Sequence, residues 1–221
     1  MSSELQKRIK TSFFLLCLLF LMFSYTYILI ISLIIICIIS WIEFYALISK
    51  IYKRKNRNNK IVRFILKTTS LLYLSTLIYI ILMSKLSNPE FEIFIIYSIL
   101  VSVMTDIGGL VIGRTFKGRK LTRISPKKTI SGSIGSFIFS LSLIPFFIQS
   151  IPGISFYLMI FITIIISMFS QIGDLFISYL KRKAKVKNTS NLLPGHGGVL
   201  DRIDGIIFAI PVGFLLFNLL R

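Results

Sequence analysis

The residues best suited to chemistry lie in a polar segment near the C-terminal end, SYLKRKAKVKNTSNLLPGHGGVLDRID, residues 178–204. This polar segment separates two long apolar runs and contains the only histidine, His196, within a Pro-Gly-His-Gly-Gly turn. It also holds two of the eight acidic residues, Asp201 and Asp204. Carboxylates beside Lys and Arg suit a site where Mg²⁺ binds through hard oxygen ligands and phosphate oxygens complete its shell.

The glycines and aspartates of the polar segment have specific geometric uses. Gly197 and Gly198 follow His196 directly, and glycines let a backbone turn tightly and approach a ligand closely. Asp201 and Asp204 are three residues apart, so on a helix they would share a face and could share an ion. The alternative for either aspartate alone is a helix N-cap. His196 would be either a phosphate contact or a structural part of the turn.

Two further groups of residues could contact phosphate. The sequence SPKKT at 125–129 offers Lys127 and Lys128 as positive charges, although two lysines in a polar loop are common. Ser178 lies near Lys181 and Arg182 by helical spacing, so its hydroxyl could contact a phosphate. It could equally be a small packing residue between helices.

The elements that must position these residues are membrane spans. Of the 221 residues, 55% are hydrophobic and only 15% are charged. The apolar residues come in blocks near the roughly 20 residues that a helix needs to cross a bilayer. We therefore expect an all-α, polytopic integral membrane protein with about seven transmembrane helices. The expected spans are two within 11–49 that turn near residues 24–26, and then 68–83, 91–113, 134–149, 154–180 and 203–220.

The positive charges orient these spans. The net charge is +18, and with seven spans 24 of the 26 Lys and Arg residues fall on one side of the membrane. The positive-inside rule makes that side cytoplasmic. This predicts a cytoplasmic N-terminus and an active site that faces the cytoplasm. Because the basic residues lie in loops between spans, we expect them to meet anionic lipid headgroups or substrates and exclude nucleic acid as a partner.

The polar segment resembles the C-terminal signature of the CDP-diacylglycerol synthases, also called phosphatidate cytidylyltransferases. That signature reads S-x-x-K-R-x-x-x-x-K-D, then a short spacer, then P-G-H-G-G-x-x-D-R-x-D, and the match runs from Ser178 to Asp204. The family's central loop, S-P-K-K-T-W-E-G, resembles residues 125–132. The resemblance implies one membrane-embedded cytidylyltransferase domain over residues 1–221. Its catalytic part would be 91–221, while 1–90 is similar only as apolar spans.

The resemblance also implies the reaction. The cytidylyl group of CTP would pass to phosphatidate, giving CDP-diacylglycerol and pyrophosphate for phospholipid biosynthesis. The family implies Mg²⁺ and allows a second, monovalent cation. The partners would be CTP, phosphatidate and the bilayer of the cell (inner) membrane, and a homodimer is compatible with the family. The alternatives are a CTP-dependent kinase of lipid alcohols such as phytol or dolichol, a catalytically degenerate relative, a transporter or channel, and a non-catalytic scaffold.

The same resemblance implies roles for individual residues. The implied metal ligands are Asp174, Asp201 and Asp204. The implied catalytic residues are Asp201, Asp204, Lys187 and His196. The implied substrate-binding residues are Ser178, Lys181, Arg182, Arg202, Gly197, Gly198, Lys127 and Lys128. Three positions depart from the family pattern, because Asn188 replaces an Asp, Ser131 a Glu and Ile130 a Trp. Losing two carboxylates predicts weaker metal binding or a changed substrate preference.

Overall fold

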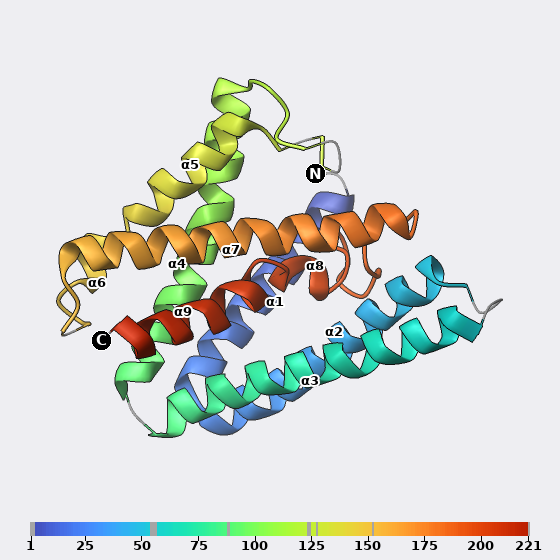
Figure 1. Cartoon of the computed structure of the whole chain (residues 1–221), viewed down its shortest axis with the longest axis horizontal. Helices are drawn as coiled ribbons and strands as arrows, with labels where there is room; N and C mark the ends of the chain where they lie inside the picture. The colour runs from blue at the N-terminus through green and yellow to red at the C-terminus, as the bar shows by residue number, and fades with distance from the viewer. Residues whose placement is uncertain are drawn as a thin grey trace. The chain divides into compact units, whose positions relative to one another are not determined.

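The computed structural model describes residues 3–53, 57–87, 89–122, 125–126, 128–151 and 153–220. These residues form helices and no strand (Figure 1). The helices are α1 (Ser3–Ser24), α2 (Thr26–Ile51), α3 (Arg57–Ser87), α4 (Pro89–Phe116), α5 (Ile130–Leu141), α6 (Ile144–Phe147), α7 (Phe156–Lys183), α8 (Leu200–Ile203) and α9 (Ile206–Leu220). The expected all-α fold is therefore confirmed.

Six helical stretches in the described part of the chain are long and apolar enough to cross a membrane. They are Thr26–Ile51, Arg57–Leu86, Phe91–Phe116, Ile130–Phe147, Phe156–Lys183 and Leu200–Leu220. The remaining expected span falls on α1, whose apolar part, Ile9–Met22, is shorter. The expected turn near residues 24–26 lies where α1 ends and α2 begins. The protein is thus a multi-pass membrane protein.

Helix α3 begins earlier than the hydropathy pattern predicts. The expected span begins at residue 68, yet α3 already begins at Arg57. Lys and Arg are good helix formers, so a run of basic residues marks the edge of the apolar stretch but does not end a helix. The fifth span differs too, because α5 ends at Leu141 and the short α6 restarts with a proline in its first turn.

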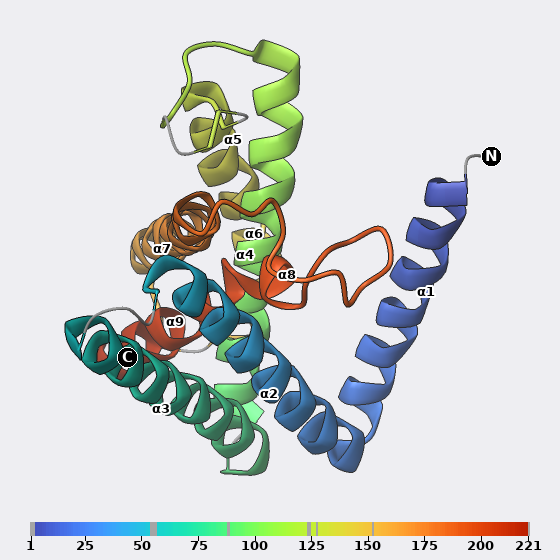
Figure 2. The same cartoon turned by 90° about the vertical axis from the view of Figure 1, so that its right-hand side faces the viewer.

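The chain divides into two compact units, each described here by itself. The first unit contains residues up to Ile78 together with Leu180–Ile203. In it, α1 and α2 form a V that closes at their connection (Figure 2), and α2 lies beside α3 in both views. The indole Nε1–H of Trp41 on α2 donates a 3.1 Å hydrogen bond to the backbone carbonyl of Lys67 on α3. This bond fixes the register of the two helices.

The second unit contains Tyr79–Tyr179 and Asp204–Arg221. Its helices α4 and α5 meet through small residues, which allow close backbone approach in membranes. A Cβ added to Gly109 would lie 2.8 Å from the hydroxyl oxygen of Ser136, and one added to Gly132 would lie 2.8 Å from the carbonyl oxygen of Gly109. Side chains larger than hydrogen at these glycines would push α5 away from α4.

Helices α4 and α7 of the second unit are joined by buried hydroxyl pairs. The oxygen–oxygen distances are 2.6 Å for Tyr97–Thr163, 2.7 Å for Ser102–Ser170 and 2.8 Å for Thr105–Ser167. Next to the first pair, the rings of Phe94 and Phe217 stack with centroids 4.5 Å apart, which brings α9 onto α4. Each hydroxyl provides a hydrogen-bond partner for the other in a region with little water. The pairs therefore hold α7 in one register on α4.

Candidate active site

The loop that carries the Pro-Gly-His-Gly-Gly turn, residues 184–199, is called the signature loop. Leu193 and Gly197 exchange backbone hydrogen bonds of 2.8 and 3.0 Å, which close the turn around His196. Gly195 and Gly197 have φ angles of +76° and +90°, values that other residues rarely adopt. The N–H of Gly198 donates to Asp201, so the N–H groups of Gly197 and Gly198 serve the loop itself. Their predicted contact with substrate stays a prediction.

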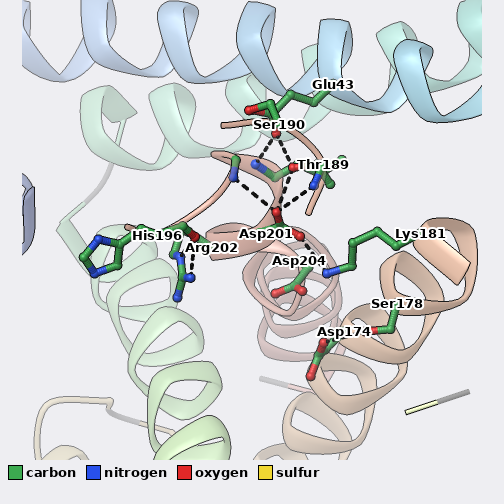
Figure 3. Close-up of polar contacts among 12 residues, drawn as sticks. Glu43, Asp174, Ser178, Lys181, Thr189, Ser190, His196, Asp201, Arg202 and Asp204 are labelled. Atoms are coloured by element: carbon green, nitrogen blue, oxygen red, sulfur yellow. Dashed lines mark hydrogen bonds and ion pairs between the residues drawn. The ribbon is translucent and has the colours of Figure 1, made fainter. Parts of the chain in front are cut away.

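Glu43 of α2 holds the middle of the signature loop and its C-terminal end (Figure 3). One carboxylate oxygen accepts hydrogen bonds from the hydroxyl of Ser190 at 2.5 Å and the N–H of Val199 at 3.1 Å. The other accepts from the hydroxyl of Thr189 at 2.8 Å and the N–H of Leu200 at 2.9 Å. The residue is only 4% exposed. Four donors around one buried carboxylate make Glu43 the centre of the loop's structure.

Asp201 forms a second carboxylate centre beside the first. Its Oδ1 accepts from the ammonium of Lys181 at 2.6 Å, and its Oδ2 accepts from the N–H of Thr189 at 2.8 Å and the N–H of Gly198 at 3.2 Å. The hydroxyl of Thr189 lies 3.0 Å from the same Asp201 oxygen and 2.8 Å from Glu43, so it links the two centres. Asp201 thereby joins the end of α7 to the signature loop, and its predicted role as a metal ligand stays a prediction.

The side chain of His196 has structural contacts with α1. Its Nδ1 lies 2.7 Å from the hydroxyl of Thr11, and its Nε2 lies 3.3 Å from the hydroxyl of Ser12. Thr11 also donates to the carbonyl of Pro194. The guanidinium of Arg202 donates to the carbonyl of His196 from Nη2 at 2.5 Å and from Nε at 3.2 Å. Of the two readings of His196, these contacts support the structural one, and phosphate contact stays a prediction.

Two of the predicted site residues, one substrate-binding and one catalytic, are exposed in the first unit. Arg182 lies in the last turn of α7, and Lys187 lies in the signature loop. Both side chains are accessible to an anionic ligand. Asn188, which replaces a family aspartate, is exposed as well and supplies neutral donors and an acceptor in place of a charge.

In the second unit, Asp174 of α7 meets the loop that precedes α5. Its carboxylate forms an ion pair with the ammonium of Lys128 and accepts a 3.3 Å hydrogen bond from the hydroxyl of Ser178. The Lys128 backbone is held by a 2.8 Å bond from the N–H of Leu121. Two separated parts of the family pattern, the SPKKT loop and α7, therefore lie together. Lys127 lies outside the described residues.

Asp204 lies in the same unit as Asp174 and is 8% exposed. One of its carboxylate oxygens accepts the N–H of Gly205 at 3.0 Å. A Cβ added to Gly173 would lie 2.5 Å from the Asp204 carbonyl oxygen and 2.6 Å from the ring of Phe208. Gly173 thus lets the backbone of Asp204 pack directly on α7, one residue before Asp174. The two predicted metal ligands of this unit are therefore on adjoining backbone segments.

The helical arrangement expected for Asp201 and Asp204 is not found. Helix α8 ends at Ile203 and α9 begins at Ile206, so Asp204 lies in the turn between them. Asp201 and Asp204 therefore do not share a face of one regular helix. The physical reason is the two-residue turn at Asp204 and Gly205, where Gly205 packs on Ser170 and Ser102: an added Cβ would lie 2.6 and 3.0 Å from their hydroxyls.

Ser131 and Ile130, which replace an acidic and an aromatic residue of the family pattern, lie at the start of α5. The hydroxyl of Ser131 donates to the carbonyl of Lys117 and lies 3.0 Å from that of Thr129. Thr129 caps the N-terminus of α5 by accepting the N–H of Gly132 at 3.1 Å. Ile130 is 45% exposed. These residues shape the start of α5 and contribute no charge.

The residues of the second unit provide a donor set that suits Mg²⁺. Asp174 and Asp204 supply carboxylate oxygens, and Ser178 supplies a hydroxyl next to Asp174. Among the described residues, no three His, Cys, Asp or Glu side chains gather into a cluster that could enclose a metal ion alone. Mg²⁺ commonly takes one or two carboxylates and completes its shell with substrate phosphates and water, so this donor set fits.

Sequence reasoning missed the role of Glu43. The only local signal was an acidic residue inside an apolar span, which predicts a polar partner but not which one. Its four hydrogen-bond donors lie in residues 189–200, far along the chain. The contacts of Thr11 and Ser12 with His196 had no sequence signal at all.

Comparison with known proteins is consistent with this geometry. The Cytidylyltransferase family model matches residues 1–220. A phosphatidate cytidylyltransferase of Staphylococcus haemolyticus is 43% identical over 124 residues, 54% of this chain and 46% of the relative. The phosphatidate cytidylyltransferase of Bacillus subtilis is 40% identical over 129 residues, which are 57% of this chain and 48% of the relative. That of Rickettsia typhi is 39% identical over 143 residues, which are 61% of this chain and 62% of the relative. The chain spans about half the length of the first two relatives. Because the family model covers nearly the whole sequence, the chain belongs to the cytidylyltransferase family.

Proposed function

We propose that this protein transfers the cytidylyl group of CTP to phosphatidate, giving CDP-diacylglycerol and pyrophosphate. The names of its relatives support this reaction. The structural observation that carries it is the ion pair of Lys128 with Asp174, because it brings the SPKKT loop onto α7 next to Gly173, on which the backbone of the buried Asp204 packs. Carboxylates and a lysine at one place suit a ligand that combines phosphates with a divalent cation.

The proposed chemistry is a displacement at phosphorus. A phosphate oxygen of phosphatidate forms a bond to the α-phosphorus of CTP, and the bond from that phosphorus to the bridging oxygen of the β-phosphate breaks. Pyrophosphate leaves with the electron pair. Such a transfer needs positioning and charge neutralisation more than covalent help from the protein. Arg182 and Lys187 are exposed and able to bind phosphate oxygens, with Lys128 as a third cation.

In this proposal Asp174 and Asp204 hold Mg²⁺, and a ligand role for Asp201 stays an expectation from the family resemblance. When bound, the ion neutralises charge on the triphosphate and on the leaving pyrophosphate. The family's monovalent cation would be a second ion. The excess of Lys and Arg on one side supports a location in the cell (inner) membrane with the site facing the cytoplasm. A homodimer is kept as a family expectation, and the mass of the purified protein in detergent tests it.

The test is the formation of CDP-diacylglycerol from labelled CTP and phosphatidate by the full chain in lipid nanodiscs. Product formation is measured once with Mg²⁺ and once with a chelator that removes it. The rate of the Asp204→Asn variant is then compared with that of the wild type. The matched control is Glu92→Gln, which also removes one acidic charge from the second unit but lies in an ion pair with Lys85. We expect Mg²⁺-dependent product, a loss of about 100-fold in Asp204→Asn, and a change below about twofold in the control.

Two further arms separate the outcomes. Phytol replaces phosphatidate in one arm, and a phosphorylated alcohol as the sole product would refute the proposal. In the other arm Asn188→Asp is combined with Ser131→Glu, which restores the two carboxylates of the family pattern. A folded wild type without activity that this double variant activates would identify a degenerate site. Inactivity of both would end the enzyme assignment.

A further inference from the structure

A basic pocket of about 320 Å³ lies between α2 and α3 in the first unit. Its lining residues, which define the basic pocket, are Tyr45, Lys60, Arg63, Phe64 and Lys67. None of them belongs to the polar segment or to the loop before α5. The three cations are spaced three and four residues apart on α3, so they lie on one face of the helix.

Aromatic residues of α2 hold two of these cations in place. The guanidinium of Arg63 lies 5.5 Å from the centre of the Tyr45 ring, and its Nη2 donates a 2.9 Å hydrogen bond to the Tyr45 hydroxyl. The ammonium of Lys67 lies 4.8 Å from the Tyr45 ring centre and 4.9 Å from that of Trp41. The rings thus position the charges without neutralising them.

No carboxylate neutralises the basic pocket in the part of the chain that the structure describes. The ion pairs found there belong to Lys85, Lys128 and Lys181. Glu43, which lies on α2 between the two aromatic residues, is occupied by the signature loop. Like charges one turn apart on a helix repel each other, so an anion bound among them would be stabilised by all three.

The position of the basic pocket on α3 favours a lipid over a soluble anion. With 31 residues α3 is about 46 Å long, while the hydrocarbon core of a bilayer is about 30 Å thick. The charged end that carries the basic pocket must therefore emerge at the level of the headgroups. Between the cations, Ile61 and Phe64 are exposed by 51% and 69%. Cations interleaved with exposed apolar residues match a ligand that has both a phosphate and acyl chains.

We propose that the basic pocket binds the phosphate of an anionic phospholipid headgroup, at a site separate from the catalytic residues. Arg63 would bind two phosphate oxygens with its planar donors, and Lys60 and Lys67 would add point charges. The acyl chains would lie along the apolar residues that follow on α3. This site does not depend on the proposed reaction, because it requires neither CTP nor Mg²⁺.

Trp41 is the only tryptophan in the chain and lies against Lys67, so its fluorescence reports on the basic pocket. The experiment uses the full chain in neutral detergent micelles without nucleotide or Mg²⁺. Phosphatidylglycerol with brominated acyl chains is added, because bromine quenches tryptophan only at short range. Brominated phosphatidylcholine serves as the lipid without net charge. We expect quenching by the anionic lipid at about a tenth of the concentration needed for the neutral one.

The variant removes two cations of the basic pocket and keeps Lys67, since Lys67 contacts the reporter. It is Lys60→Gln with Arg63→Gln, compared with a matched control, Lys50→Gln with Lys53→Gln. Both variants lose two positive charges from the same region, and Lys50 and Lys53 do not line the basic pocket. We expect the first variant to lose the preference for the anionic lipid, and the control to keep it within about twofold.

Each result decides the proposal. Loss of the preference in the first variant alone supports it. An equal loss in both variants would show a general attraction to positive charge and overturn it. A wild type that does not prefer the anionic lipid would overturn it without any variant, even if the variants fold poorly. Inorganic phosphate that displaces the lipid at equal concentration would assign the basic pocket to free phosphate and overturn the lipid assignment.

Discussion

Replacing Glu43 with glutamine should release the signature loop from α2. The carboxylate accepts four hydrogen bonds and is 4% exposed. A glutamine keeps one acceptor oxygen, so two donors lose their acceptor and face an amide NH₂. A hydroxyl can rotate away, but the N–H of Val199 or Leu200 cannot. Hydrogen bonds to a charged group contribute about 1.5–3 kcal/mol each. The bond of the backbone N–H is lost in full and that of the hydroxyl only in part, so we expect the loop to open more easily by about 2–4 kcal/mol.

Hydrogen exchange of the Val199 and Leu200 amides measures this opening directly, because both N–H groups donate to Glu43. A cost of about 2–4 kcal/mol corresponds to exchange that is roughly 30- to 1000-fold faster. The matched control is Glu92→Gln, which removes a partly exposed ion pair with Lys85 and should have no effect on these amides. If Glu43→Gln leaves their exchange within about threefold of the wild type in folded protein, Glu43 does not anchor the loop and the reasoning is wrong.

Three substitutions test other contacts. Gly198→Ala places a Cβ 2.5 Å from a Glu43 carboxylate oxygen, so trypsin should cut the signature loop faster. Gly173→Ala pushes the Asp204 backbone away from α7, and the Mg²⁺ concentration for half-maximal activity should rise with little change in the CTP requirement. Tyr97→Phe removes a buried 2.6 Å hydrogen bond and should lower the free energy of unfolding by about 1 kcal/mol, measured by thermal denaturation.

Much of the fold could be predicted because its signals are local. Apolar blocks of bilayer length predicted the spans, and the polar residues near position 25 predicted the break between α1 and α2. The start of α3 at Arg57 could not be predicted from hydropathy, since basic residues favour helix as well as the membrane surface. The turn between α8 and α9 was also missed, because nothing in the sequence near Asp204 indicates that the helix is broken there.

The candidate site was predictable where its residues are contiguous. The polar segment drew attention because its charges and glycines interrupt apolar sequence. Glu43 did not, because the partners that define it are about 150 residues away and no local pattern encodes them. The resemblance to the family named Asp201 as a metal ligand, whereas the structure also gives it four contacts that organise the loop. Residue type and spacing indicate which side chains could bind a metal or substrate. Only the tertiary contacts show which of them already form hydrogen bonds within the protein.

The hydroxyl pairs between α4 and α7 have a consequence for how this protein evolves. At each pair the two helices share one hydrogen bond, so the loss of one hydroxyl leaves the other buried without that partner. A single substitution at Ser102 or Ser170 is therefore costlier than replacing both residues with alanine. Descendants of this sequence should change the members of a pair together, and correlated substitution at 102 and 170 would be the trace of that constraint.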